Sequence, residues 1–336
     1  MSENSKLTNS VEKLQHRKRQ TLSPKLDVVF QALFGEVGSE RITSNLLEAI
    51  LQEKVEDIDL SKNIVLRRKY EHDKMGVLDV FAKINGTENC NIELQVSKQS
   101  ELIERLLFYW ARVYVREIHE GNQYGTLNRC IVILICDYSL EEMKKLEESE
   151  AFEGMKKDFE NLPYHTEWKI IEKDFRKIVL TDKLELHIIS LEKARKMREK
   201  DKQDKLLDWL KFLENPKSKE VLEKMEENEV LKEAGEKLDT LSDDIEMQMI
   251  ADSRWMAIAD EYARREAAMI EGREEGLEKG LAEGRAEGRK EGIVEGEKKA
   301  KLETAKKMLE KNIPLKTIVE ITELTEEEII KMSNNK

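Results

Sequence analysis

Hydrophobic residues in the first third of the chain follow first a helical and then a strand-like spacing. Apolar side chains three and four residues apart over 39–51 predict an amphipathic helix. Shorter patterns at 64–70, 77–84 and 90–96 predict three β-strands. The dipeptide Asn85-Gly86 separates the last two, and it is a strong hairpin signal. The pattern therefore predicts a helix followed by three strands, two of them joined as a hairpin.

A longer helix and a buried strand are predicted next. Ser100 is suited to cap a helix that runs to about Glu120 and ends at Gly121. Residues 129–138, RCIVILICDY, form a nearly continuous apolar run, which is typical of a strand covered on both faces. These elements together predict a compact α/β unit.

The rest of the chain is predicted to be mainly helical and charged. One more strand is predicted at 184–191, and residues 206–213, LLDWLKFL, carry the apolar stripe of a packed helix. Two short helices are predicted around Leu324, with Thr325 as the N-cap of the second. A DNA-binding helix-turn-helix would have this outline, but three glutamates at 326–328 would repel phosphates. A packing hairpin is the favoured interpretation.

Glycine recurs at every fourth residue near the C-terminus, at positions 272, 276, 280, 284, 288, 292 and 296. On a helix, this spacing rotates successive glycines by about 40°, so they wind around the helix instead of forming one seam. Each glycine costs a helix roughly 1 kcal/mol, which close packing against another helix would offset. The repeat predicts a helical association or spacer segment, with a partly disordered linker as the alternative.

Composition limits the class of protein. The 336 residues are 39% hydrophobic and 38% charged, which is enough for a core in part of the chain and for long solvated helices in the rest. The polar N-terminus resembles no secretory signal, and the longest apolar run is too short to cross a bilayer. Three cysteines without a CxxC pair are expected to be buried and reduced. We therefore expect a cytoplasmic protein with no membrane partner.

The net charge of −12 is unevenly distributed. Residues 214–260 carry 14 acidic and 6 basic side chains, hence −8 of the −12, which leaves −4 for all other residues. Basic clusters lie at 16–20 and 67–69 in the N-terminal half. The overall acidity therefore does not exclude a polyanionic substrate.

Two acidic residues and a glutamine form the candidate site. In the stretch CNIELQV, Ile92 and Leu94 alternate with Glu93 and Gln95, which share the opposite face of the strand. A hairpin loop of three or five residues would bring Asp79 to the face of Glu93 on the neighbouring strand. A two-residue loop would place Asp79 opposite Ile92 and turn Glu93 the other way. The candidate site depends on this register.

A close pair of carboxylates suits a hard divalent cation. Two such groups raise each other's pKa unless a cation lies between them. Mg²⁺ (or Mn²⁺) takes oxygen ligands, keeps several waters and can activate one of them against a phosphodiester. Asp79 and Glu93 are the candidate metal ligands, and the amide of Gln95 would position a water or a phosphate oxygen. An ordinary solvated sheet face is the alternative.

The helix that follows carries a basic face. Arg105, Tyr109, Arg112 and Arg116 are spaced to share one side of a helix. Arginines beside a metal site suit phosphate binding, which makes these four residues the candidate DNA-binding surface. A solvated helix face is again the alternative.

Five blocks of sequence, in the same order, resemble the Rpn-type family of recombination-promoting nucleases and related transposases. The blocks are SPKLDVVFQALFG (23–35), LDVFAKI (78–84), IELQV (92–96), RLLFYWARVY (105–114) and GNQYGTLNRCIVILI (121–135). The family belongs to the PD-(D/E)XK nuclease superfamily, and the resemblance covers roughly residues 20–215. It implies an α/β, restriction-endonuclease-like core, with a mixed central sheet flanked by helices, and Mg²⁺-dependent DNA cleavage.

By motif matching, the resemblance assigns Asp79 and Glu93 to the metal-binding positions. Gln95 stands where the superfamily usually has lysine, a departure shared with the E-x-Q pattern of the Rpn-type group. Asp27 matches the opening D-x-x-F block, and Glu48 is a candidate for an acidic residue of the first helix that would complete the site. Tyr109 and Tyr124 match aromatic positions of the blocks, where either could equally belong to the core.

The leading hypothesis is a Mg²⁺-dependent DNA endonuclease of low sequence specificity, associated with recombination or mobile elements, in which Arg105 engages the DNA backbone. The rival is a catalytically inactive DNA-binding or scaffolding protein that oligomerises through its C-terminal helices. The expected organisation is a flexible N-terminus (1–20), a nuclease-like domain (21–215), an acidic helical region (216–270), the glycine repeat (271–299) and a C-terminal helical hairpin (300–336).

Overall fold

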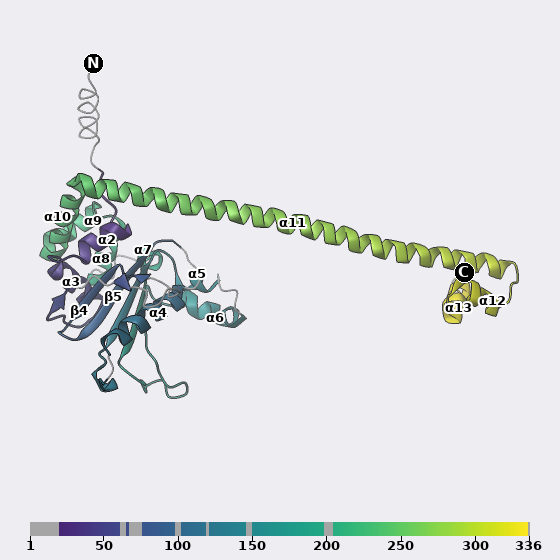
Figure 1. Cartoon of the computed structure of the whole chain (residues 1–336), viewed down its shortest axis with the longest axis horizontal. Helices are drawn as coiled ribbons and strands as arrows, with labels where there is room; N and C mark the ends of the chain where they lie inside the picture. The colour runs from purple at the N-terminus through teal and green to yellow at the C-terminus, as the bar shows by residue number, and fades with distance from the viewer. Residues whose placement is uncertain are drawn as a thin grey trace, which may run out of the picture. The chain divides into compact units, whose positions relative to one another are not determined.

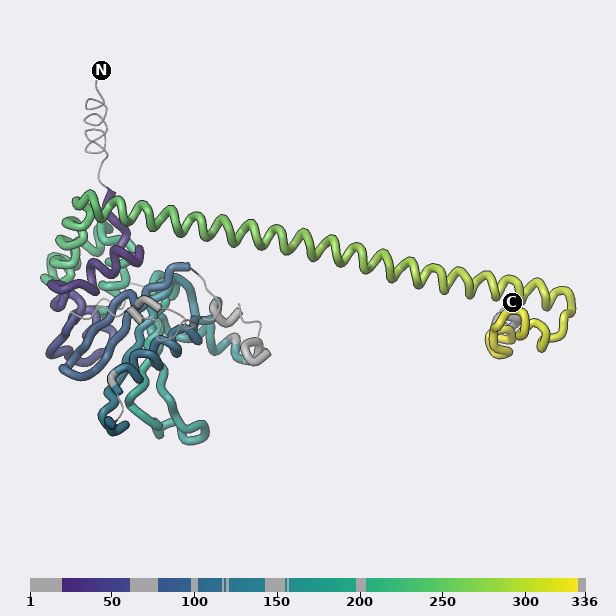
Figure 2. Tube along the Cα trace, viewed as in Figure 1, coloured from purple at the N-terminus to yellow at the C-terminus, as the bar shows by residue number. Residues whose placement is uncertain are grey.

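The computed structural model divides the chain into two compact units (Figure 1, Figure 2). The described residues are 20–60, 65–66, 76–97, 102–118, 121–145, 150–197 and 204–334. The units are Met1–Met256 and Ala257–Lys336, so the division falls within helix α11, Ile245–Glu310. Residues 1–19 of the expected mobile terminus, most of the strand expected at 64–70, the N-cap at Ser100 and the helix end at Glu120 lie outside the described residues.

A six-stranded mixed sheet forms the centre of the first unit. The order of its strands is β1 (Ile58–Asp59), β4 (Val80–Ile84), β5 (Glu88–Gln95), β6 (Cys130–Cys136), β8 (Leu184–Ser190) and β7 (His165–Trp168). Strands β5, β6 and β8 are parallel, and the other neighbouring pairs are antiparallel. This sheet and its helices confirm the predicted α/β fold class.

Strand β6 is buried along its whole length, as its apolar run predicted. It lies between β5 and β8, and no side chain from Cys130 to Cys136 reaches the surface. A strand that has neighbouring strands on both edges and is covered on both faces has no solvated face. Apolar and polar residues therefore do not alternate along it. Cys90, Cys130 and Cys136 are free and buried, which confirms the expectation for the cysteines.

Helix α4, Leu102–Tyr114, covers one face of the sheet. Its Leu106 packs in a buried cluster with Leu134 of β6 and Ile188 of β8. Burial of each such side chain contributes about 1.5–3 kcal/mol to folding. Glu93 is the register partner of Leu134, and neighbours across a pair of strands share a face. Glu93 therefore points to the side of the sheet that α4 covers.

A layer of helices completes the first unit. Phe34 and Trp209 meet edge to face with ring centroids 5.8 Å apart, which joins α2 to α8. The helices predicted at 39–51 and 206–213 are confirmed as α3 and α8. The acidic region expected over 216–270 spans the division between the two units, because α9 and α10 pack in the first one. The helices of this layer are α2 (Asp27–Phe34), α3 (Glu40–Leu51), α8 (Lys205–Glu214), α9 (Lys219–Glu227) and α10 (Glu229–Asp243).

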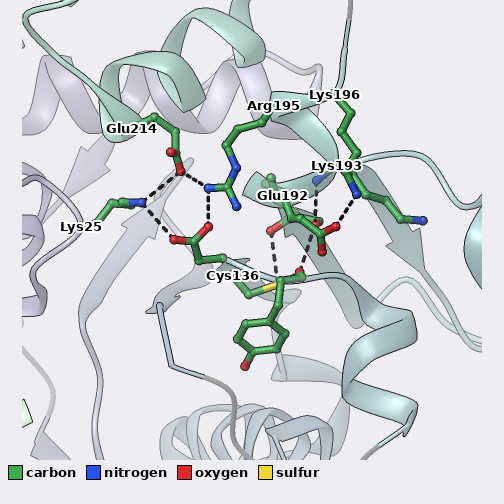
Figure 3. A network of polar contacts seen from close by, with 11 residues as sticks. Lys25, Cys136, Glu192, Lys193, Arg195, Lys196 and Glu214 are labelled. Carbon is green, nitrogen blue, oxygen red and sulfur yellow. Dashed lines mark hydrogen bonds and ion pairs between the residues drawn. The ribbon is translucent and has the colours of Figure 1, made fainter. Parts of the chain in front are cut away.

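An ion-pair network holds the segment before α2 against the sheet (Figure 3). Lys25 Nζ lies 2.9 Å from Asp137, directly after β6, and 3.2 Å from Glu214 at the end of α8. Arg195 of the short helix α7, Leu191–Arg195, pairs with the same two carboxylates. The network thereby joins the start of the first helix to the carboxyl end of a parallel strand.

The strand predicted over 77–84 is interrupted, which corrects the expectation of one continuous strand. Gly76–Val77 forms β3, which pairs with β2 (Val65–Leu66) in a separate two-stranded sheet, and β4 begins at Val80. Leu78 is fully buried beside Phe81 and Val113. Packing of Leu78 thus outweighs continuation of the ladder, and Asp79 lies at the break.

The second unit consists of most of α11 and the predicted helical hairpin. Residues 271–299 are helical throughout, so the helical reading of the glycine repeat holds. Helices α12 (Leu315–Thr322) and α13 (Glu326–Asn334) pack on the end of α11 around Ala305, Ile318 and Ile329. As predicted, the hydroxyl of Thr325 caps α13 by accepting the N–H of Glu328 at 3.3 Å. None of the described helices has an apolar stretch long enough to cross a membrane.

A buried polar chain fastens β8 on the face of the sheet away from α4. The carboxylate of Glu185 accepts two hydrogen bonds from Arg129, at 2.9 and 2.8 Å, and lies 2.8 Å from His187. His187 in turn lies 2.9 Å from His165 of β7. Burial alone would raise the pKa of Glu185, but the hydrogen bonds from His187 and Arg129 outweigh it and lower that pKa to about 2.

Replacement of Glu185 by glutamine should lower the free energy of unfolding by about 3 kcal/mol, because it leaves the Arg129 charge without its buried partner. Glu53→Gln is the matched control: Glu53 also pairs with Arg129, but its side chain is 39% exposed, so the loss should stay below about 1 kcal/mol. Urea unfolding of both variants measures the difference. Equal losses would contradict the assignment of the buried pair.

Candidate active site

The hairpin between β4 and β5 sets the register of the candidate site. Ile84 pairs with Glu88, so the loop has three residues, and Asn85 and Gly86 take positive φ angles of 49° and 75°. Glycine and asparagine tolerate this region, which explains the hairpin signal. Of the loop lengths considered from the sequence, the three-residue one is observed.

Asp79 lies opposite Glu93 as a result of this register. Val80 is the last paired residue and faces Ile92, so the next position brings residue 79 to residue 93. The carboxylate of Asp79 accepts the backbone N–H of Leu94 at 2.8 Å. This hydrogen bond fixes the Asp79 side chain against β5 although the residue stands outside the ladder.

The end of helix α2 closes the site from another side. Gly35 directly follows α2, and a β-carbon there would lie 3.2 Å from Val80 Cγ2 and 3.5 Å from the carbonyl oxygen of Asp79. The first distance is tighter than most such contacts, and the second is an ordinary van der Waals contact. Absence of a side chain at residue 35 therefore lets α2 approach the backbone that carries Asp79.

Glu93 is buried beside a second polar side chain of its own strand. It is 5% exposed, and Asn91, two residues earlier on the same face, is 1% exposed. Asn91 Nδ2 donates to Glu93 Oε1 at 3.0 Å. Among the described residues, Asn91 Oδ1 has no hydrogen-bond partner. A buried amide oxygen without a donor is available to accept a hydrogen bond from a water or to coordinate a cation.

The pKa values of both carboxylates are raised. Burial raises the pKa of Glu93 to about 8, and the charge of Asp79 adds to this effect. Burial also raises the pKa of Asp79 to about 6, although the Leu94 N–H opposes it. The charge of Arg105 lowers both pKa values without restoring them. The site is therefore short of positive charge when both groups are ionised.

Both ends of the Gln95 amide are engaged by protein groups. Nε2 donates to the carbonyl and hydroxyl oxygens of Ser97, both at 2.9 Å, and Oε1 accepts Arg105 Nη2 at 2.7 Å. Arg105 also lies over the Tyr109 ring, 6.0 Å from its centroid. Gln95 thus holds an arginine of α4 near the carboxylates.

The structure brings Asp27 to the site and leaves Glu48 away from it. The charge of Asp27 contributes to the raised pKa of Asp79, and Asp27 itself pairs with Arg254 of α11 at 2.5 Å. Glu48 Oε1 instead accepts the Val55 N–H at 3.2 Å, in the turn after α3. Within the described ranges, no contact joins Glu48 to Asp79 or Glu93. We therefore leave Glu48 out of the site.

The predicted basic face is only partly helical. Helix α4 ends at Tyr114 instead of near residue 120, and Arg116 lies in the 3₁₀ turn η1, Val115–Glu117. Arg116 is exposed in that turn. Arg112 remains on α4 over the Phe108 ring, at 5.8 Å. Tyr124, in the turn η2 (Tyr124–Thr126), is 84% exposed and does not belong to the core.

Three neighbours of the site were absent from the sequence-based prediction. Asn91 had a signal, because it shares the strand face of Glu93. Gly35 had none without knowledge of the α2–β4 contact. Arg254 is separated from Asp27 by 227 residues, a pairing that no local pattern indicates.

The donor set suits a hard cation that keeps part of its water shell. No group of three or more histidine, cysteine, aspartate or glutamate side chains is arranged to hold a metal in the described part of the chain. Asp79 and Glu93 supply two carboxylates, and the unsatisfied Asn91 oxygen lies beside them. Mg²⁺ is commonly bound by one or two carboxylates and completed by water. The residues present therefore fit such an ion.

In EDTA, the protein should lose stability as pH rises from about 5 to about 8. The folded state holds protons on Glu93 and Asp79 that the unfolded chain releases at lower pH, so ionisation in this window favours unfolding. Glu93→Gln stays neutral, and its free energy of unfolding should depend less on pH and exceed that of wild type at pH about 8. Urea unfolding across the window tests this, and parallel pH profiles would contradict it.

Comparison with known families agrees with this geometry. The chain matches the family model described as PD-(D/E)XK nuclease family transposase over residues 24–268. Searches of curated proteins and of solved structures give no significant match. The matched range holds both Asp79 and Glu93 and covers most of the chain, which confirms the resemblance drawn from the sequence. The chain therefore belongs to the PD-(D/E)XK nuclease family transposases.

Proposed function

We propose that the protein is a divalent-metal-dependent DNA endonuclease of low sequence specificity. The observation that carries the proposal is the placement of the half-buried Asp79 opposite the buried Glu93, with the unsatisfied Asn91 oxygen beside it. A family of nuclease-like transposases supports DNA as the substrate. The same pair would hold Mg²⁺ or Mn²⁺, an ion that activates water and neutralises charge on a phosphodiester.

Different residues of the chain would have different roles at such a site. Asp79 and Glu93 would bind the metal ion, and the Leu94 N–H would keep Asp79 in place. Arg112 and Arg116, near the end of α4, would contact phosphates of the duplex. Phosphate contacts carry no sequence information, so cleavage would depend little on sequence. The three buried, free cysteines suit the reducing cytoplasm, where we place the protein.

Replacement of Asp79 by asparagine or Glu93 by glutamine should reduce metal-dependent plasmid nicking by about 100-fold or more, because loss of one preorganised electrostatic contact costs about that much. EDTA should abolish nicking by wild type. The matched control is Asp239→Asn, an acid of α10 whose side chain is 52% exposed. Variants as active as this control would refute the assignment of the pair.

A scaffolding role through α11 is the second candidate, and it is compatible with nuclease activity. The space that a side chain would occupy is open at all seven repeat glycines in the described structure. Leu277, Leu281 and Ile293, each following one of the glycines, are more than half exposed. We propose that these glycines allow a second copy of α11 to approach closely, as small residues do between packed helices.

Gly280→Leu combined with Gly284→Leu should reduce self-association of the full-length protein, measured by analytical ultracentrifugation, while helix content by circular dichroism stays equal or rises. Arg285→Gln, beside the second glycine, is the control and should leave association unchanged. A monomeric wild type, or variants that associate like wild type, would reject the proposal.

A further inference from the structure

Gln95 and Arg105 behave as one unit at the candidate site. The 2.7 Å contact between Gln95 Oε1 and Arg105 Nη2 joins the strand that carries Glu93 to the helix that covers it. Ser97 accepts both hydrogen bonds of the Gln95 amide nitrogen, which sets the direction of the amide oxygen. The amide is thus oriented to accept a hydrogen bond from Arg105.

The position of Arg105 is further restricted by its neighbours. Its guanidinium lies over the ring of Tyr109, one turn along α4, at 6.0 Å. A guanidinium held by a hydrogen bond and an aromatic face loses little further freedom when it binds an anion. Arg105 is partly buried and donates to Gln95, which lies two residues after Glu93 on the same face of β5, so its guanidinium lies on the side of the sheet that bears Glu93.

The proposed hydrolysis would be accelerated by a positively charged group at the phosphate. The oxygen of a water bonds to phosphorus while one P–O ester bond breaks, and one water proton goes to the leaving alcohol as the other stays with the new phosphate or dissociates. Negative charge grows on the phosphate oxygens as the new bond forms. A preorganised arginine stabilises this charge more than it stabilises the ground state.

We propose that Arg105 is a catalytic residue that contacts the phosphate under attack, and that Gln95 is the positioning residue that holds Arg105. This proposal rests on the proposed nuclease function. This role differs from general attraction of DNA, which Arg112 and Arg116 would provide. It also assigns the polar groups of Gln95 to the protein instead of to water or phosphate.

Kinetics of plasmid nicking by the full-length protein at saturating Mg²⁺ test the assignment. Arg105→Gln should lower kcat about 100-fold, with DNA affinity measured in Ca²⁺ changed less than about threefold. Arg105→Lys should recover part of kcat. Arg41→Gln, an arginine of α3 with a 59% exposed side chain, is the matched control and should match wild type.

A charge-relocation variant separates a catalytic cation from a structural one. Because the two side chains touch, a lysine at residue 95 would bring its ammonium close to the place of the guanidinium. Gln95→Lys combined with Arg105→Gln should therefore recover kcat to within about tenfold of wild type, whereas Gln95→Ala alone should lower kcat about tenfold.

The outcomes distinguish the two claims. If wild type cleaves and Arg105→Gln has the same kcat, the role of Arg105 is overturned while the nuclease function stands. The same follows if kcat of the double variant is no higher than that of Arg105→Gln. A wild type without metal-dependent cleavage would overturn both. A loss confined to DNA affinity would return Arg105 to the phosphate-binding surface.

Discussion

Burial of the Glu93 carboxylate beside the half-buried Asp79 is the constraint around which the first unit is organised. Glu93 lies on β5 and Asp79 directly precedes β4. Burial raises both pKa values, and the charge of Asp79 raises that of Glu93 further. A fold keeps such an arrangement only where many other contacts hold it in place. Here the Leu94 N–H, the tight packing of Gly35 and the Asn91 amide supply those contacts.

The surrounding architecture is suited to holding this pair. The central strands have no exposed side chain, so their position is fixed by packing, and α4 places its arginine over the same face as Glu93. On the other face, the chain from Arg129 through Glu185 to the two histidines fastens the outer strands. Apolar packing holds the side of the sheet that bears the site, and on the other side the polar chain lies beside buried isoleucines such as Ile131 and Ile133.

Much of this fold follows from the sequence, for identifiable reasons. The apolar run of β6, the helical spacings of α3 and α8 and the Asn85-Gly86 turn are local signals that agree with the final structure. The break at Leu78 could not be predicted, because a buried contact with Phe81 and Val113 outweighs the strand pattern. The early end of α4 similarly had no local signal.

The candidate site was predictable only in part. Alternation placed Glu93 and Gln95 on one face, but loop length left the position of Asp79 open until the register was observed. Asp27 and Arg254 meet across most of the chain, and Glu48 was assigned from resemblance and lies elsewhere. Long-range pairings of this kind depend on tertiary packing, which periodicity does not encode.

The three-residue turn after β4 gives the site an unusual sensitivity to chain length. Side chains along a strand alternate between the two faces of the sheet. Gain or loss of one residue in that turn would therefore place the Asp79 and Glu93 side chains on opposite faces. Such an event would turn the side chains of one strand over and separate the two acids. A single inserted or deleted residue in the hairpin would therefore be enough to dismantle the candidate site.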